Sequence, residues 1–252
     1  MPQLKSLIDH LDALLDPGRF DDFGPNGLQV PGPDEVHVVA TGVSAHAELF
    51  ERAAGLGADL VVVHHGLFWD HGPRALDAAA KRRLQLLFDH DIGLAAYHLP
   101  LDGHPEVGNN ALIAQGIGAT STEPFAPHRG QPIGVVARFD EPIARDELLA
   151  RTEHVTGRAP LAFPTGPERV HGVGIVSGAG SDYLGDAIDR GLDAFITGEP
   201  TERVMATARE AHITFVAAGH YATETFGVRR LGELLAERFG VRHEFVDVPN
   251  PI

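Results

Sequence analysis

Leu60-Val61-Val62-Val63, followed directly by His64-His65-Gly66, is an apolar run that ends in two imidazoles and a glycine. A short continuous apolar run is typical of a buried strand, and open α/β sheets bind their ligands beyond the carboxyl ends of the strands. We therefore predict a strand over residues 59–63, with two adjacent histidines placed where a ligand would bind.

Helical and strand-like patterns alternate around this stretch. The predicted elements are a helix over 4–15, a strand over 36–41, a helix over 45–56, the strand over 59–63, a helix ending at 90, a strand over 92–97 and a helix over 106–116. Alternating strands and helices indicate an α/β fold, with mostly parallel sheets flanked by helices.

The second half of the chain repeats the first. The matching segments are 36–39 with 170–173, 57–63 with 191–197, and 92–98 with 214–220. The first two pairs share one offset of 134 residues, so the strand–helix–strand segment needs no gap. Chance similarity is the alternative, but the equal spacing favours an internal duplication. We predict two similar α/β lobes, 1–125 and 126–252. The second lobe is expected to open with a linker, a strand over 133–139 and a helix over 145–154.

Composition excludes several classes of protein. The 252 residues carry a formal net charge of −15, so direct binding to nucleic acid is not expected. There is no cysteine, which removes disulfides, thiolate metal sites and thiol nucleophiles. Neither a secretory signal nor an apolar run long enough for a membrane span is apparent, so a cytoplasmic protein without membrane contact is predicted.

His64 and His65 are the first candidate ligands. Adjacent strand residues point to opposite faces of a sheet, so both imidazoles reach one site only where the strand is ending. The alternative is one ligand beside one structural histidine. The equivalent strand of the second half ends in Thr197-Gly198-Glu199 without a histidine pair, which favours a functional reason for the pair.

Two His-x-x-x-carboxylate pairs follow equivalent predicted strands. Asp102 comes four residues after His98, with Pro100 expected to fix a loop between them. Glu224 comes four residues after His220, at the start of a helix predicted over 221–235, where such spacing places both side chains on one face. A capping or loop role for Asp102 and an exposed pair for His220 and Glu224 are the alternatives.

The candidate metal ligands are therefore His64, His65, Asp102, His220 and Glu224. Three imidazoles and two carboxylates exceed one tetrahedral zinc site and suit two divalent ions about 3.5–4 Å apart. Nitrogen and oxygen donors are compatible with Zn, Mn or Fe. We place the site between the lobes. Glu199 and His98 are candidates for proton transfer, and His98 is also a candidate to hold Asp102.

Several motifs together resemble the Nif-three-like family, whose bacterial members are called GTP cyclohydrolase I type 2 homologues. The matching stretches are residues 26–30, 63–66, 97–102, 109–112, 197–199 and 219–224. The resemblance implies two facing α/β lobes, a toroidal homohexamer and a dinuclear site made by the five candidate ligands, with His64 and His65 on different metals and Glu224 as the bridge. The chain is too short for the domain that longer members insert between the lobes. The loop before Asn26 departs from the family pattern, so no role is carried over to it.

Two functions fit these observations. The first is a metal-dependent hydrolase of the GTP cyclohydrolase type, acting on a nucleotide-like or other small molecule. The second is a non-enzymatic metal-binding chaperone or regulator, which the 15 histidines also suit.

Overall fold

The computed structural model describes residues 2–73 and 75–252, and its contacts divide the chain into two compact units. The first unit runs to Leu101 and resumes over Gly227–Pro249, and the second comprises Asp102–Phe226 with Asn250–Ile252. This division differs from lobes of 1–125 and 126–252. Residues 102–125 belong with the second sheet, and the C-terminal helix and strand belong with the first.

The first unit contains a five-stranded sheet in the order β1-β4-β3-β2-β11. Its strands are β1 (Gly27–Val30), β2 (Val38–Ser44), β3 (Leu60–His65), β4 (Gly93–Ala96) and β11 (Arg242–Phe245). Only β1 runs antiparallel to its neighbour, so this sheet is mostly parallel, as predicted. Leu60 to Val63 are fully buried, which explains why β3 reads as an unbroken apolar run.

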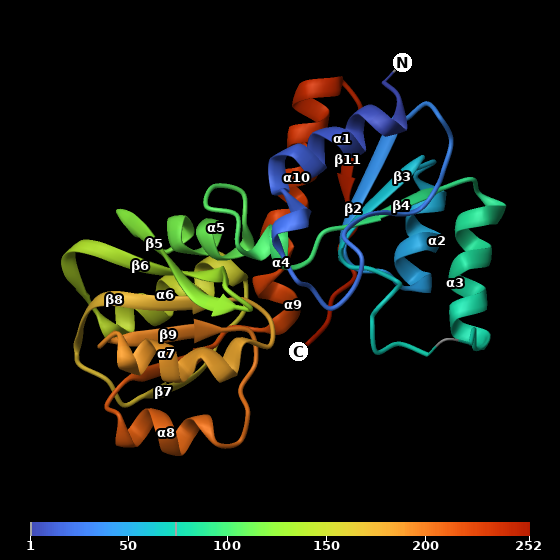
Figure 1. Cartoon of the computed structure of the whole chain (residues 1–252). Coiled ribbons are helices and arrows are strands. Elements are labelled where there is room, and N and C mark those ends of the chain that lie inside the picture. The colour runs from blue at the N-terminus through green and yellow to red at the C-terminus, as the bar shows by residue number, and fades with distance from the viewer. Residues whose placement is uncertain (1, 74) are drawn as a thin grey trace. The chain divides into compact units, whose positions relative to one another are not determined.

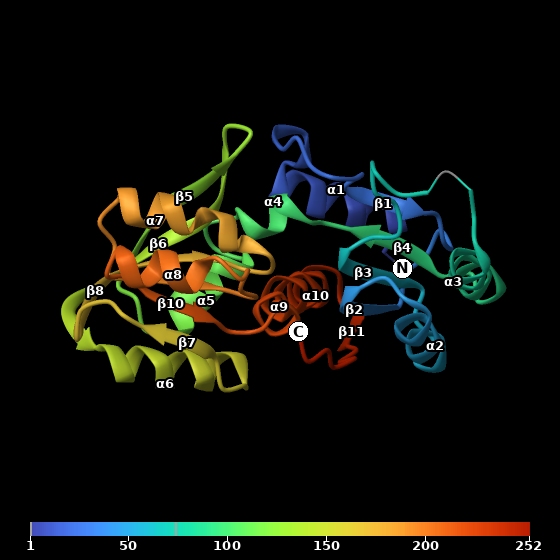
Figure 2. The same ribbon diagram turned by 90° about the horizontal axis from the view of Figure 1, so that it is seen from below.

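Helices cover both faces of the first sheet. They are α1 (Leu4–Leu15), α2 (Ala47–Gly55), α3 (Ala78–Asp89) and the greater part of α10 (Thr225–Phe239). α1 and α10 lie on one face, where His10 and Phe239 contact each other at 5.7 Å between ring centroids, and α2 and α3 lie on the other (Figures 1 and 2). Apolar residues on α1 recur every three or four positions, so one side of this helix is buried.

The second unit contains a six-stranded sheet in the order β5-β6-β8-β9-β10-β7. Its strands are β5 (Ser121–His128), β6 (Gln131–Ala144), β7 (Leu161–Pro164), β8 (Arg169–Val176), β9 (Ala194–Thr197) and β10 (Thr214–Ala217). β8, β9 and β10 are parallel, whereas the β5–β6, β6–β8 and β10–β7 pairs are antiparallel. The prediction of a mostly parallel sheet is therefore wrong here: the segment taken for a linker plus one strand forms a hairpin that joins the sheet.

Helices also cover both faces of the second sheet. They are α5 (Asn109–Gly116), α6 (Arg145–Thr156), α7 (Leu184–Asp189) and α8 (Val204–Glu210), and the short helices α4 (Leu99–Asp102) and α9 (His220–Thr223) follow β4 and β10. α5 and α6 lie on one face and α7 and α8 on the other (Figure 2). Ile113, Leu148 and Val173 meet in the core under α5 and α6.

The two units share a hydrogen-bonding pattern at the 134-residue offset found in the sequence. In the first unit the Asp59 carboxylate accepts hydrogen bonds from the backbone N–H groups of His37 and Val38. In the second, Asp193 accepts from the corresponding groups of His171 and Gly172. Each aspartate thereby ties the start of one parallel strand to the start of the next.

Within residues 2–73 and 75–252, no helix combines the length and the apolar character needed to cross a membrane.

Candidate metal centre

His64 and His65 are the last two residues of β3, so the strand continues through the pair instead of ending before it. Pairing with β4 stops at Val63, while pairing with β2 continues to Ser44 opposite His65. Because one neighbour is lost here, the two side chains need not diverge. Their ring centroids lie 4.7 Å apart. The structure thus brings both predicted imidazoles together in the first unit.

His98 joins the pair. It follows β4, and the potential ligand atoms of His64, His65 and His98 all lie within 4.8 Å of one another. Its ring centroid is 5.0 Å from that of His64 and 5.5 Å from that of His65. β4 and β3 are parallel neighbours, so their carboxyl ends bring these residues to the same edge of the sheet. His98 was expected to support Asp102 or to move a proton, and its place in a three-histidine cluster was not predicted.

Hydrogen bonds at Nδ1 orient the imidazoles. The Nδ1 of His64 lies 3.0 Å from the carbonyl oxygen of Tyr97, which can only accept, so Nδ1 carries the proton and Nε2 carries the lone pair. The Nδ1 of His65 lies 3.0 Å from the hydroxyl of Ser44. A hydrogen-bonded Nδ1 with Nε2 as the ligand atom is the usual arrangement of metal-binding histidine. The donor set therefore fits a divalent metal ion.

Asp22 orients the third imidazole and was not among the predicted residues. Its Oδ1 accepts from Nδ1 of His98 at 2.7 Å, and its Oδ2 accepts from the backbone N–H of Leu99 at 2.9 Å. Asn26 donates to the same carboxylate and accepts from the backbone N–H of His98. The loop whose sequence departs from the family pattern therefore holds His98 in place.

The surroundings of Asp22 favour its charged form. Burial alone would raise the pKa of this carboxyl, but the hydrogen bond and charge of His98, with hydrogen bonds from Asn26 and the Phe23 N–H, lower it to about 2. A depressed carboxyl pKa stabilises the folded state above pH 4.

We expect the acid titration of Asp22 to be visible in the stability of the protein. Its contribution should be about 2 kcal/mol at neutral pH and should disappear as the pH falls from about 4 to about 2. Urea unfolding at a series of pH values would measure this contribution as the difference in unfolding free energy between wild type and Asp22→Asn. The difference should shrink over this pH interval. Asp21→Asn, at the exposed neighbour, is the control, and a difference independent of pH would contradict the prediction.

Asp102 lies at the end of α4 and is buried. Pro100 was expected to keep this segment a loop, but it sits in the first turn of the helix, where a proline needs no N–H donor. In the second unit, the Asp102 Oδ1 accepts from the Asn109 amide at 2.8 Å and from the Ser177 hydroxyl at 3.0 Å. Both donors fix one oxygen of the carboxylate. Residues of α5 and of the loop after β8 therefore support Asp102, and the support predicted from His98 stays a prediction.

His220 and Glu224 also come together, although not on one helix. The helix predicted over 221–235 is interrupted: α9 ends before Glu224, whose φ and ψ of −112° and 6° are not helical, and α10 starts after it. His220 Nε2 lies 3.2 Å from Glu224 Oε1, and His220 Nδ1 lies 3.5 Å from Glu199 Oε1. Burial would lower the pKa of His220, but the two carboxylates, Glu224 first, raise it.

Two glycines leave the room that this group needs. Gly178, with φ of +61°, lies so close to the carboxylate that a Cβ there would be 2.1 Å from Glu224 Oε1 and 3.1 Å from His220 Nε2. A Cβ on Gly198 would be 2.6 Å from both the Gly178 carbonyl oxygen and the His220 Cα. The loop at Ser177 and Gly178 therefore approaches the side chains of His220 and Glu224 closely.

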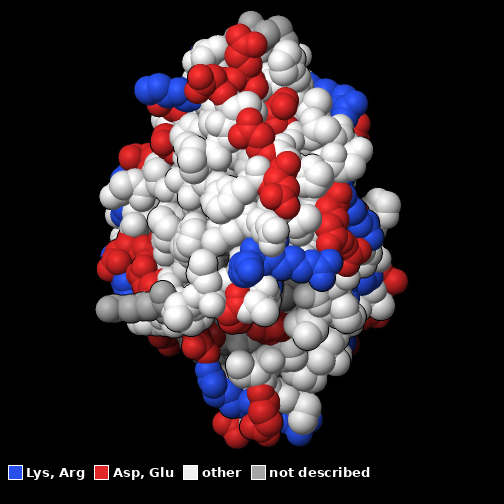
Figure 3. All heavy atoms as spheres, turned by 90° about the vertical axis from the view of Figure 1, so that its right-hand side faces the viewer, with Lys and Arg blue, Asp and Glu red and all other residues white. Residues whose placement is uncertain are grey.

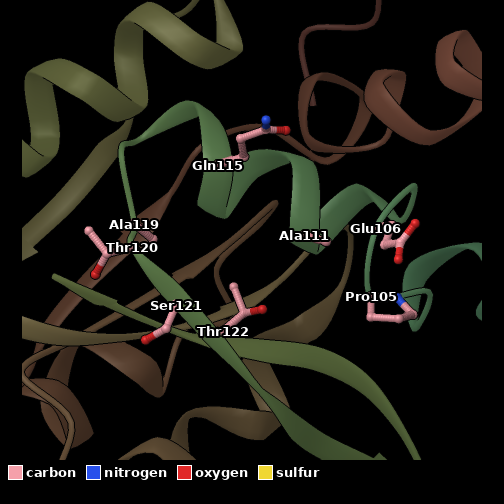
Figure 4. Close-up of a pocket in the computed structure, with 8 residues that line it drawn as sticks. All are labelled: Pro105, Glu106, Ala111, Gln115, Ala119, Thr120, Ser121 and Thr122. Carbon is pink, nitrogen blue, oxygen red and sulfur yellow. The ribbon is translucent and has the colours of Figure 1, made fainter.

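A pocket in the second unit lies away from these groups. It has a volume of about 330 Å³ and is formed between α5 and the start of β5 (Figure 4). Its lining residues are Pro105, Glu106, Ala111, Gln115, Ala119, Thr120, Ser121 and Thr122. With one carboxylate and no imidazole, this pocket offers no set of metal ligands.

The five predicted ligands are divided between the two units. His64 and His65 belong to the first, and Asp102, His220 and Glu224 belong to the second. Each group is assembled within its own unit, and each alone is an incomplete ligand set for two metal ions. These histidines and carboxylates could bind metal ions.

Known proteins are similar to this chain in sequence and in fold. The model of the Duf34/NIF3 (NGG1p interacting factor 3) family matches residues 2–251. The chain belongs to the DUF34/NIF3 family. The resemblance seen in the sequence motifs is thereby confirmed over nearly the whole chain.

Relatives within the DUF34/NIF3 family include proteins named GTP cyclohydrolase 1 type 2 homolog. The one from Pseudomonas aeruginosa is 40% identical over 248 residues, covering 98% of both chains. The one from Vibrio cholerae is 42% identical over 252 residues, covering 99% of this chain and 98% of the relative. Protein ybgI, a solved structure described as of unknown function, has a TM-score of 0.93 at 38% identity over the full length of both chains. TTHA1606 from Thermus thermophilus has a TM-score of 0.92 at 36% identity, again over the full length of both chains.

Proposed function

We propose that this chain binds two divalent metal ions through His64, His65, Asp102, His220 and Glu224, and hydrolyses a small, nucleotide-like substrate. The observation that carries the proposal is the group of imidazoles at the end of β3, with Nδ1 of His64 engaged by a backbone carbonyl and Nε2 left as the ligand atom. The curated relatives' name, GTP cyclohydrolase 1 type 2 homolog, supports the choice of substrate class.

The proposed centre takes ligands from both units. The first supplies imidazoles and the second supplies an imidazole and two carboxylates, so a full set for two ions requires both contributions. We propose that His64 and His65 serve different ions and that Glu224 bridges them. Nitrogen and oxygen donors without sulfur suit Zn, Mn or Fe. A homohexamer, which the family resemblance implies, and the cytoplasmic location expected from the sequence belong to the same proposal, and the mass of the protein in solution tests its assembly.

Divalent ions held in this way would lower the pKa of bound water to near neutrality and polarise the bond to be broken. The chain's own groups have other tasks. Asp22 holds His98 through Nδ1, so the Nε2 of His98 can accept or deliver a proton beside His64 and His65. Glu199 lies next to Nδ1 of His220 and fixes the orientation of that ring. The hydrogen bonds from Asn109 and Ser177 restrain Asp102.

Metal content and turnover, measured on the same preparations, test the proposal. We expect wild-type protein loaded with Zn, Mn or Fe to hold two ions and to turn over at least one compound of a panel of GTP, other phosphoesters and amides. His65→Ala and Glu224→Ala each remove a ligand, so both should lose metal and turnover. His90→Ala, at an exposed histidine that ends α3, should lose neither.

The outcomes separate the two functions considered. Wild type that binds two ions but turns over nothing in the panel, while His65→Ala and Glu224→Ala lose metal, would replace the hydrolase by a non-enzymatic metal-binding protein. A wild type that takes up no metal under any loading condition would overturn the whole proposal.

A further inference from the structure

A second pocket lies wholly within the first unit and has no assigned role. Its volume is about 520 Å³, and it is formed by the segment after Gly66 together with α3. The apolar part of its lining includes Leu67, Phe68, Trp69, Leu76 and Leu84. Phe68 and Trp69 are 42% and 38% exposed, so two aromatic side chains in the lining remain accessible to a ligand. Volumes of roughly 300–1,000 Å³ with apolar and aromatic walls are typical of small-molecule sites.

Trp69 links this pocket to the histidine cluster. It lines the pocket, and its ring centroid is 6.0 Å from that of His65 and 5.3 Å from that of His98, which it meets edge-on. The wall of the pocket is thus also a neighbour of the imidazoles proposed to serve the reaction.

Among the described residues, few polar groups line the pocket. The Asp77 carboxylate accepts a hydrogen bond from the Ala80 N–H at the start of α3, and Arg83 brings one positive charge. On the face that carries α3, acidic and basic side chains are interspersed with uncharged areas (Figure 3). A lining of this kind favours a flat, weakly polar ring over a strongly charged ligand, since aromatic faces bind other π-systems by stacking.

We propose that this pocket binds a planar heteroaromatic ring of purine size, as the aromatic part of the substrate. The proposal rests on the proposed function, because it assigns a binding site to the base of a nucleotide-like substrate. Trp69, Phe68 and the apolar residues of α3 provide the surfaces against which the ring packs.

Trp69 is the single tryptophan of the chain, so its fluorescence reports directly on the pocket. Metal-free protein would be titrated with guanosine and, separately, with ribose 5-phosphate, which has no aromatic ring. We expect saturable quenching by guanosine and none by ribose 5-phosphate. Quenching that does not saturate, or equal responses to both compounds, would overturn the proposal.

A pair of variants on α3 completes the test. Ala80 lines the pocket, and Ala80→Phe fills part of it while leaving Trp69 as the reporter. Ala78→Phe adds the same ring at an exposed position of the same helix outside the lining. Guanosine should bind at least about tenfold more weakly to Ala80→Phe, which corresponds to the loss of one ordinary packing contact. Its affinity for Ala78→Phe should equal that for wild type. Equal affinity in both variants would contradict the assignment of the pocket.

Failure of this inference can be told apart from failure of the proposed function. Neither alanine is a proposed ligand, so both variants should retain two metal ions by elemental analysis. If the protein binds metal but shows no saturable response to guanosine, only the proposed ring site is refuted. If it binds guanosine but no metal, only the proposed metal centre is refuted.

Discussion

Replacing Gly178 with alanine should lower the affinity for divalent metal by about a hundredfold, the upper end of the losses seen when the supports of metal ligands are changed. The added methyl group would lie 2.1 Å from Glu224 Oε1 and 3.1 Å from His220 Nε2, so both side chains must move. Isothermal titration of metal-free protein with Zn²⁺ at neutral pH would measure the effect.

Gly191→Ala is the matched control for this change. Gly191 has φ of +64°, almost the same as the +61° of Gly178, but no heavy atom lies within 4 Å of the place a Cβ would take. Both variants should lose roughly 1–2 kcal/mol of stability from the left-handed backbone. Only Gly178→Ala should lose metal, and equal metal affinity in the two variants would show that Glu224 and His220 are not the ligands.

Replacing Asn110 with alanine should destabilise the protein by about 3 kcal/mol, because three hydrogen bonds to buried groups are lost at once. The Asn110 amide donates to the Ile133 carbonyl at 2.7 Å and to the Asp102 carbonyl at 3.3 Å, and its oxygen accepts from the Ser177 N–H at 2.7 Å. One fully buried side chain thereby joins α4, β6 and the loop after β8. Urea unfolding followed by circular dichroism would give the change in free energy.

Gln115→Ala is the control on the same helix, since Gln115 is exposed and makes no hydrogen bond through its side chain among the described residues. Its free energy of unfolding should stay within about 0.5 kcal/mol of wild type. If Asn110→Ala were no less stable than Gln115→Ala, water would have to replace the three lost bonds, and Asn110 would not be needed to hold Asp102.

The sequence predicted best those parts of the molecule that depend on local apolar patterns. β3 and β4 are buried apolar runs within a residue or two of their predicted bounds, because a strand covered on both faces admits few polar residues. Histidines and carboxylates that follow such runs are conspicuous, and the structure groups His64 with His65 and His220 with Glu224.

What the sequence could not supply depends on contacts between distant segments. Asp22 lies 76 residues from His98 in a loop without periodicity, and nothing local distinguishes it from its neighbour Asp21. The antiparallel β5–β6 hairpin was hidden by the prolines at 124, 127 and 132, which suggested a linker. Pro124 and Pro127 lie in β5, at the edge of the sheet, and Pro132 lies near the start of β6. The interruption at Glu224 was also invisible, because the residues on both sides are compatible with a helix.

The strand order of the first sheet has a consequence for synthesis of the protein. β11 pairs with β2, yet the two strands are separated by the whole of the second unit's main segment, Asp102–Phe226. A ribosome therefore releases an uninterrupted stretch that contains every strand of the second sheet before it makes the last strand of the first. Since domains fold as units during translation, the second sheet can be completed first, while one edge of β2 in the first sheet is still unpaired. During this interval the exposed edge of β2 is the part of the nascent chain that most needs protection from aggregation.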